Sequence, residues 1–313
     1  MKRNPLVSII IPCYNSSSTI SNAINSVLIQ DYANIEIVIV NDGSTDDTEI
    51  VLKKYTNLSK FVYIKQENQG VSNARNKGIA VAKGEFIMFL DSDDSYRQGY
   101  ISQMVSKIIS ENADAVITPL NKSYSDNSGV ISFHELLKSS ILNRMRIGFY
   151  SAIYKKKLIQ YFDIEFPPNI SYGEDQVFLW SYMIHTKKIG FVNKIFYQYN
   201  DNDSSAMHNI SEKILTALDA QRIILQKVKL NRPEEYDFMY KYGYSKEFFY
   251  IISLCVSSKR YDIVKGITKN YNLRKIAFNI LGYPKIKVNI GAFVCILSPS
   301  LFFLISKISH CLK

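Results

Sequence analysis

The length, composition and charge of the chain exclude several classes of protein. The chain has 313 residues, of which 47% are hydrophobic and 21% charged, as in a globular protein and unlike a disordered one. Its net charge of +10 is concentrated in residues 245–313, which hold 11 Lys and Arg against 2 Asp and Glu. A basic face spread over the folded molecule, typical of nucleic-acid-binding proteins, is therefore not expected.

The first 120 residues alternate between apolar, β-branched runs and segments whose apolar residues have helical spacing. The predicted strands are 6–12, 35–42, 61–66, 85–91 and 113–119, and the predicted helices are 16–30, 44–55, 70–82 and 96–110. The serines at the start of 16–30 can cap the first helix. This order predicts an α/β fold, in which a mostly parallel sheet carries helices on both faces.

The alternation weakens beyond Pro119. Residues 132–145 and 171–186 have the pattern of helices, 187–200 that of strands, and 211 to about 280 is mostly helical. We therefore expect a first domain of residues 1–210 and a helical, basic C-terminal region of residues 211–313.

Polar residues follow three of the predicted strands. They are Pro12-Cys13-Tyr14-Asn15, Asn41-Asp42-Gly43 and Asp91-Ser92-Asp93. In a parallel sheet these strand ends meet at one edge, where ligands bind and where helix starts favour anions. The sequence therefore predicts a site for an anionic ligand at this edge.

Asp91 and Asp93 are separated by one residue on a turn after a buried strand. Two carboxylates placed in this way can hold a hard cation such as Mg2+ or Mn2+, which completes its shell with phosphate and water. A D-x-D pattern is also common in turns whose aspartates bond the local backbone. The convergence of three polar strand ends favours the metal, which would arrive with a diphosphate.

Five ordered motifs resemble those of the inverting glycosyltransferases of family 2, which have the GT-A fold. The motifs are VSIIIPCYN at 7–15, NDGSTDDT at 41–48, GVSNARNKGIA at 70–80, DSDD at 91–94 and GED at 173–175. The resemblance covers roughly residues 5 to 205 and is closest to bacterial enzymes that build capsule, lipopolysaccharide or other surface glycans.

The resemblance implies roles for individual residues. The donor, a UDP-sugar, would be bound by Pro12, Tyr14, Asn15, Asp42, Asn73, Arg75, Asp91 and Ser92, and Mn2+ or Mg2+ by Asp93. Tyr14 would lie against the uracil and Asp42 would accept a hydrogen bond from it. The residues alone leave other interpretations open, because Asp42 fits a helix-capping turn and Arg75 fits a surface position.

Inverting transfer needs a base that takes the proton of the acceptor hydroxyl. The resemblance assigns this role to Asp175, with Glu174 as a neighbour that caps the helix or touches the acceptor. Ser171 and Glu174 also fit an S-x-x-E capping box, in which acids of the first turn have only a structural role. His208 can contact a phosphate or the metal, or can be a solvent-exposed loop histidine.

Residues 288–306 contain no charge and lie between Lys287 and Lys307. This length can span a bilayer, but Asn289, Gly291 and Pro299 interrupt it, which favours a helical hairpin that lies in the membrane interface. A true span and a buried helix pair are the alternatives. The basic charge of 245–313 favours an anionic membrane surface.

Together these features predict a metal-dependent glycosyltransferase in the cytoplasm, peripheral on the inner face of the cell membrane. The absence of a recognisable signal peptide and of a disulfide-type or metal-type cysteine spacing supports this location. The expected partners are a UDP-sugar donor and a glycan or lipid-linked acceptor. Alternatives are an enzyme that transfers sugar to a polyprenyl phosphate and a catalytically silent nucleotide-sugar-binding scaffold.

Overall fold

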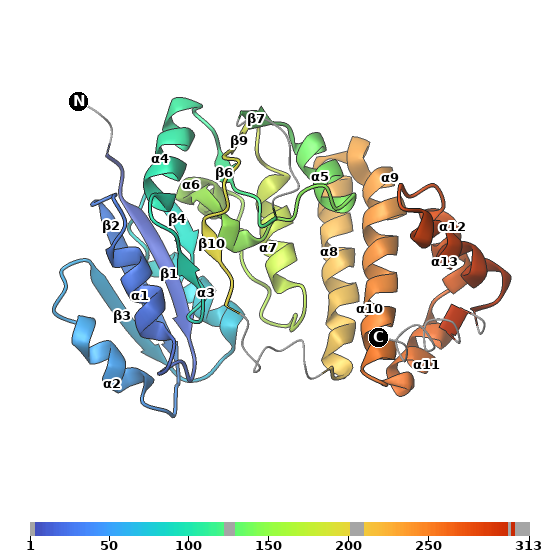
Figure 1. The fold of residues 1–313 in the computed structure, drawn as a ribbon, viewed down its shortest axis with the longest axis horizontal. Coiled ribbons are helices and arrows are strands. Elements are labelled where there is room, and N and C mark those ends of the chain that lie inside the picture. The colour runs from blue at the N-terminus through green and yellow to red at the C-terminus, as the bar shows by residue number, and fades with distance from the viewer. Residues whose placement is uncertain (1–3, 122–128, 201–209, 300–301, 304–313) are drawn as a thin grey trace. The chain divides into compact units, whose positions relative to one another are not determined.

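The computed structural model describes residues 4–121, 129–200, 210–299 and 302–303 (Figure 1). The chain forms two compact units. The first consists of Met1–Asn169 and Glu174–Asn202, and the second of Ile170–Gly173 and Asp203–Lys313. The functional division at residue 210 stays a prediction.

The first unit is built on an eight-stranded sheet with the order β3-β2-β1-β4-β8-β6-β9-β7. Neighbours among β3, β2, β1 and β4 are parallel, β8 is antiparallel to both β4 and β6, β9 is parallel to β6, and β7 is antiparallel to β9. The strands are β1 (Val7–Cys13), β2 (Ile35–Asp42), β3 (Phe61–Gln66), β4 (Phe86–Phe89), β6 (Ala115–Ile117), β7 (Val130–Ile131), β8 (Ala152–Lys155) and β9 (Ile189–Phe191). The prediction of a mostly parallel sheet is confirmed.

Helices cover both faces of this sheet. Every residue of β1 and β2 is buried, as expected for strands that are enclosed on two sides. On one face, Ile9 and Ile11 belong to a core cluster with Ile24 of α1. On the other face, Ile10 packs so closely on α3 that a methyl group added at Gly78 would lie 2.4 Å from Ile10 Cγ2.

The other elements of the first unit connect or flank the sheet. They are α1 (Ile20–Leu28), α2 (Thr48–Leu52), α3 (Val71–Val81), β5 (Ser95–Tyr96), α4 (Tyr100–Ser110), α5 (Phe133–Ile141), α6 (Lys156–Tyr161), α7 (Glu174–Met183), β10 (Tyr197–Gln198) and the short 3-10 helices η1 (Lys53–Tyr55) and η2 (Phe149–Ser151). β5 and β10 pair as a separate antiparallel ribbon.

Two details of the predicted helices are wrong. No serine caps α1, because its N-cap is Thr19, whose side chain makes no capping bond, while the Ser16 carbonyl accepts the Thr19 and Ile20 N–H groups. The helix predicted from residue 96 begins at Tyr100, because Tyr96 pairs with Tyr197 in the ribbon and Gly99 has a φ of 81°.

The second unit is helical, as predicted for 211 to about 280. Its main helices are α8 (Thr216–Asn231), α10 (Ser245–Ser257), α11 (Tyr261–Asn270), α12 (Leu273–Ile280) and α13 (Ile286–Leu297). Shorter helical segments are the 3-10 helices η4 (Glu212–Leu215) and η5 (Pro233–Glu235), α9 (Tyr236–Phe238) and the π-helix η6 (Met239–Tyr244). A single helix over 288–306 is wrong, because α13 ends at Leu297 and Ser298 is extended. Among the described residues, no helix has the length and apolar character needed to cross a bilayer.

The close approach of α3 to the sheet predicts a stability difference between two glycines. Gly78→Ala should lower the free energy of unfolding by about 1–3 kcal/mol, because its methyl group would overlap the fully buried Ile10. Gly266→Ala in α11 is the matched control, since nothing lies within 4 Å of its added methyl and helical alanine is favourable by about 0.5–1 kcal/mol. Urea unfolding of both variants measures the difference, and equal shifts would contradict the packing described here.

Candidate active site

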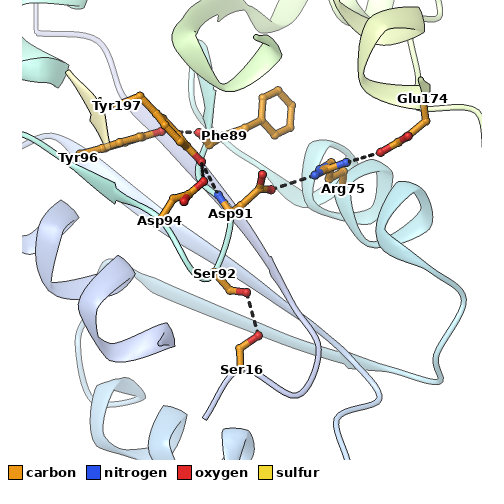
Figure 2. Close-up of polar contacts among 9 residues, drawn as sticks. All are labelled: Ser16, Arg75, Phe89, Asp91, Ser92, Asp94, Tyr96, Glu174 and Tyr197. Atoms are coloured by element: carbon orange, nitrogen blue, oxygen red, sulfur yellow. Dashed lines mark hydrogen bonds and ion pairs between the residues drawn. The ribbon is translucent and has the colours of Figure 1, made fainter. Parts of the chain in front are cut away.

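Loops from the ends of β1, β2 and β4 are bonded together at the carboxyl edge of the sheet. Asn15 has a φ of 48°, and its Oδ1 accepts the Thr45 N–H at 2.8 Å. Ser16 Oγ lies 2.8 Å from Ser92 Oγ, which joins the β1 loop to the turn after β4 (Figure 2). The predicted convergence of the three strand ends is therefore present.

Asp42 organises the loop that leads from β3 into α3. One of its oxygens accepts the Gln66 Nε2 at 2.7 Å and the Gln69 N–H at 2.9 Å, and the other accepts the Gly70 N–H at 2.8 Å. The side chain is 3% exposed. The turn-forming role left open by the sequence is thus real, and recognition of a base by Asp42 stays a prediction.

The aspartates of the 91–94 turn point to different partners. The Asp94 N–H bonds the Asp91 carbonyl at 3.1 Å and closes the turn. The Asp94 carboxylate is buried and accepts the Tyr197 hydroxyl at 2.6 Å and the Asn200 N–H at 2.9 Å. Burial raises the pKa of Asp94 to about 6, against the effect of these two hydrogen bonds. The buried Asp94 side chain therefore anchors the turn to Tyr197 and Asn200. The Asp91 and Asp93 residues stay partly exposed.

The positive group beside the aspartates is Arg75 of α3 (Figure 2). Its Nη2 lies 2.9 Å from Asp91 Oδ1, and its Nη1 lies 3.3 Å from Glu174 Oε1. The Arg75 side chain is 7% exposed. Its guanidinium carbon lies over the rings of Phe149 and Phe166, at 4.5 and 5.2 Å from their centroids. Burial alone would lower the pKa of Arg75, but the charges of Asp91 and Glu174 raise it.

Arg75 was expected to face the nucleotide or to be a surface residue. The structure instead places it between Asp91 and Glu174, away from solvent, and its contact with phosphates stays a prediction. The sequence assigned the charge that compensates the aspartates to a metal ion. The buried guanidinium supplies part of that charge from within the chain.

Glu174 and Asp175 are the first two residues of α7, and the pKa of each carboxyl group is raised. Burial and the neighbouring Asp175 raise the pKa of Glu174 to about 7, although Arg75 opposes the shift. Burial also raises the pKa of Asp175, against the Gln176 N–H that its Oδ1 accepts at 2.7 Å and against the Arg75 charge. The pKa of Glu174 thus lies near neutral pH and that of Asp175 is shifted upward, the direction that strengthens a general base.

The capping box suggested for Ser171 and Glu174 is wrong. The Ser171 N–H, which a capping box directs at the glutamate, donates to Thr216 Oγ1 at 3.1 Å. The Glu174 carboxylate is bound to Arg75. Glu174 therefore bonds a residue distant in sequence, Arg75, and does not cap its own helix through Ser171.

The remaining predicted residues have varied surroundings. Pro12 is buried, and Tyr14 is 47% exposed at the end of β1, as a ring that stacks on a ligand would need to be. Asn73 donates its Nδ2 to the Gln69 carbonyl at 2.7 Å, which ties it to the start of its own helix. His208 lies outside the described residues.

Sequence reasoning missed the specific partners that hold the turn in place. Tyr197 and Asn200 bind Asp94, and the Asn200 Nδ2 also donates to the Asp93 carbonyl at 2.7 Å. The Tyr197 ring packs on Tyr150, with centroids 4.2 Å apart. In the sequence, Tyr197 and Asn200 fall in 187–200, whose pattern predicted strands without indicating a partner for either.

The oxygen donors at this edge are of the type that Mg2+ and Mn2+ prefer. Asp91 uses Oδ1 for Arg75, and Asp93 is partly exposed on the same turn. Within the described part of the chain, no three His, Cys, Asp or Glu side chains cluster closely enough to hold a metal by themselves. The residues therefore fit an ion that takes one or two carboxylates and draws its other ligands from a bound phosphate.

The buried ion pairs of Arg75 predict a large stability effect. Arg75→Met should lower the free energy of unfolding by about 3–5 kcal/mol, because it leaves two carboxylates without their partner. Arg75→Met/Glu174→Gln should recover part of this loss, since one of the two charges is then absent. Lys65→Met is the control, because Lys65 and Glu49 form an exposed pair whose loss should cost less than about 1 kcal/mol. Urea unfolding tests these values, and a loss no larger than that of the control would contradict the network.

The raised pKa of Glu174 predicts a pH dependence of stability. The folded chain binds this proton with a pKa of about 7, above the value of about 4.3 in an unfolded chain, so the stabilisation is full at low pH and is lost as the pH rises through this window. Glu174→Gln cannot titrate there. The Tm of the wild type should therefore fall relative to that of Glu174→Gln between about pH 4.3 and pH 7, whereas the exposed variant Glu234→Gln should follow the wild type. Parallel curves for the wild type and Glu174→Gln would refute the shift.

Comparison with known proteins places the fold and the site in context. The sequence profile of Glycosyl transferase family 2 matches residues 8–167, about half of the chain. Putative glycosyltransferase EpsH of Bacillus subtilis is 29% identical over 74% of this chain and 72% of its own length. Glycosyltransferase GlyA of Streptococcus pneumoniae is 31% identical over 68% of this chain, which spans only 33% of GlyA.

Solved structures share the fold at low sequence identity. S. aureus TarS 1–349 in complex with UDP-GlcNAc matches with a TM-score of 0.67 and 20% identity, over 97% of this chain and 88% of that one. The mannosyltransferase PcManGT from Pyrobaculum calidifontis, in complex with GDP-Man and Mn2+, matches with a TM-score of 0.60 and 13% identity, over 99% and 88%. The predicted GT-A-like fold followed by a helical C-terminal region is thus confirmed. From the profile match, the ordered motifs and the α/β architecture together, the chain belongs to glycosyl transferase family 2.

Proposed function

We propose that this chain transfers a sugar from a UDP-sugar to a hydroxyl group of a growing or lipid-linked surface glycan, with inversion at the anomeric carbon. The observation that carries the proposal is the Arg75 guanidinium, which binds Asp91 of the donor turn and Glu174 beside the base at the same time. A single buried charge thereby links the part of the site that would bind the donor with the part that would activate the acceptor.

The comparisons support the choice of donor and of pathway. TarS, which shares the fold, was crystallised with UDP and with UDP-GlcNAc. Minor teichoic acid biosynthesis protein GgaB of Bacillus subtilis is 29% identical over 64% of this chain, although only 24% of GgaB is matched. TarS supports a UDP-sugar as the donor, and GgaB supports a polymer of the teichoic acid kind as the acceptor.

In the proposed reaction the acceptor oxygen forms a bond to the anomeric carbon while the bond from that carbon to the diphosphate oxygen breaks. Asp175 takes the proton of the acceptor hydroxyl. Its Oδ1 accepts the Gln176 N–H, which fixes the carboxylate at the start of α7. Burial raises the pKa of Asp175, which makes it a stronger base, and the Arg75 charge opposes that shift in favour of the ionised form.

The donor would lie along the loops that end β1, β2 and β4. Tyr14 is exposed and would stack on the uracil, and Asn15, Ser92 and Asp91, which are exposed or partly exposed, would line the path from the base toward the sugar. Asp93 would hold Mn2+ or Mg2+, which as a Lewis acid stabilises the charge of the departing diphosphate. PcManGT, which shares the fold, was crystallised with Mn2+ and a nucleotide sugar.

Nucleotide release from a panel of sugar nucleotides tests the donor and the metal. Many transferases hydrolyse their donor slowly without an acceptor, so the acceptor need not be known. Release should occur from one or two UDP-sugars with Mn2+ and should be lost with EDTA and in Asp93→Ala. Release that is indifferent to EDTA and to Asp93→Ala would contradict the metal role of Asp93.

Replacement of the base distinguishes the proposed reaction from its alternatives. Asp175→Asn should lower transfer to a hydroxyl acceptor by about 10²- to 10⁴-fold, because the proposed base is then absent, whereas UDP binding should be retained. Asp237→Asn, an exposed acid of α9, is the matched control and should be neutral. Full activity of Asp175→Asn toward a polyprenyl phosphate would favour that acceptor, which needs no base, and UDP binding without any turnover would favour a silent scaffold.

A further inference from the structure

α13 carries an exposed apolar stripe in the second unit. The stripe consists of Ile286, Ile290, Phe293 and Leu297, which are 73%, 58%, 56% and 61% exposed. Their spacing of four, three and four residues places them on one face of the helix. Ala292 and Cys295 are buried on another face, so α13 is packed on the unit by one side only.

The turn before α13 is fixed by side-chain hydrogen bonds. The Asn289 Oδ1 accepts the Gly282 N–H at 2.7 Å, and its Nδ2 donates to the Tyr283 carbonyl at 2.6 Å. These bonds join the first turn of α13 to the end of α12, where Phe278 adds a further ring that is 67% exposed. The α13 stripe is thus presented by an ordered helical hairpin.

The sequence that contains the α13 stripe carries only positive charge, although Glu247 of α10 lies close enough to Tyr283 to act on it electrostatically. From residue 263 to residue 313 the sequence contains eight Lys and Arg and no Asp or Glu. Lys285 and Lys287 flank the first residue of the stripe, and both are exposed. A second copy of the chain would bring the same positive charge to this face, whereas a surface of negative phosphates would neutralise it.

We propose that the α13 stripe binds the surface of a membrane that contains anionic lipid. The four apolar side chains enter the boundary between headgroups and acyl chains, and Lys285 and Lys287 lie at the phosphates. α13 has 12 residues and a length of about 18 Å, short of the roughly 30 Å of a bilayer core, so it lies in the interface rather than crossing it. This inference does not depend on the transfer reaction, although it fits a lipid-linked acceptor.

Sedimentation of the full chain with vesicles tests the proposal. One set of vesicles contains phosphatidylcholine alone, and the other contains phosphatidylcholine with phosphatidylglycerol. The wild type should bind the anionic vesicles, and Ile290→Glu/Phe293→Glu should weaken this binding by about tenfold or more, because two charges would enter the apolar boundary. Ile50→Glu/Leu230→Glu changes the charge equally at two exposed apolar residues elsewhere and should bind nearly as the wild type does.

A second double variant tests the contribution of the two lysines to membrane binding. The mass of the protein in solution tests the alternative that the α13 stripe binds a second copy of the chain. Lys285→Gln/Lys287→Gln should weaken binding to anionic vesicles by about tenfold, with little effect on Tm, because both side chains are exposed. The proposal is overturned if the wild type fails to bind anionic vesicles, or if the control pair loses binding as much as the stripe pair. It is also overturned if the stripe pair converts a dimer into a monomer without altering vesicle binding, since the face then joins two copies. None of these outcomes bears on donor turnover.

Discussion

A guanidinium held out of water determines how the polar edge of the first unit is arranged. Arg75 bonds Asp91 and Glu174 and lies against the rings of Phe149 and Phe166, so several separate segments of the chain must meet around it. Removing one partner from a buried charge typically costs several kcal/mol, about 3–5, which gives the arrangement a strong energetic basis. The start of α7, and with it Asp175, is thereby fixed with respect to the 91–94 turn by charge as well as by packing.

The three aspartates of the 91–94 turn show how one short motif serves both structure and chemistry. The Asp94 carboxylate is buried and accepts hydrogen bonds from Tyr197 and Asn200. The Asp91 carboxylate is bound by Arg75. With the first and last aspartates engaged by the protein, the turn has little freedom to relax away from a ligand. Asp93 is partly exposed on the same turn, and the metal role that the family resemblance implies for it stays a prediction.

The parts of this site that sequence could predict are those with local signals. The apolar strands and the polar residues that end them were predictable because burial on both faces produces continuous β-branched runs, and strand order then brings Asn15, Asp42 and Asp91 to one edge. The burial of Arg75 had no local signal, since its partners lie 16 and 99 residues away in sequence. The Tyr197–Asp94 bond, across 103 residues, was hidden for the same reason.

The central claim is that this edge of the sheet binds a nucleoside diphosphate through a metal ion, and calorimetric titration of UDP tests it most directly. The titration compares the wild type with and without Mn2+, and the Asp93→Ala and Asp175→Asn variants with Mn2+. The account predicts that UDP binds the wild type and Asp175→Asn in the presence of Mn2+, and that binding is lost without the metal or in Asp93→Ala. No binding of UDP under any of these conditions, or binding that is equal with and without Mn2+ and in Asp93→Ala, would contradict it.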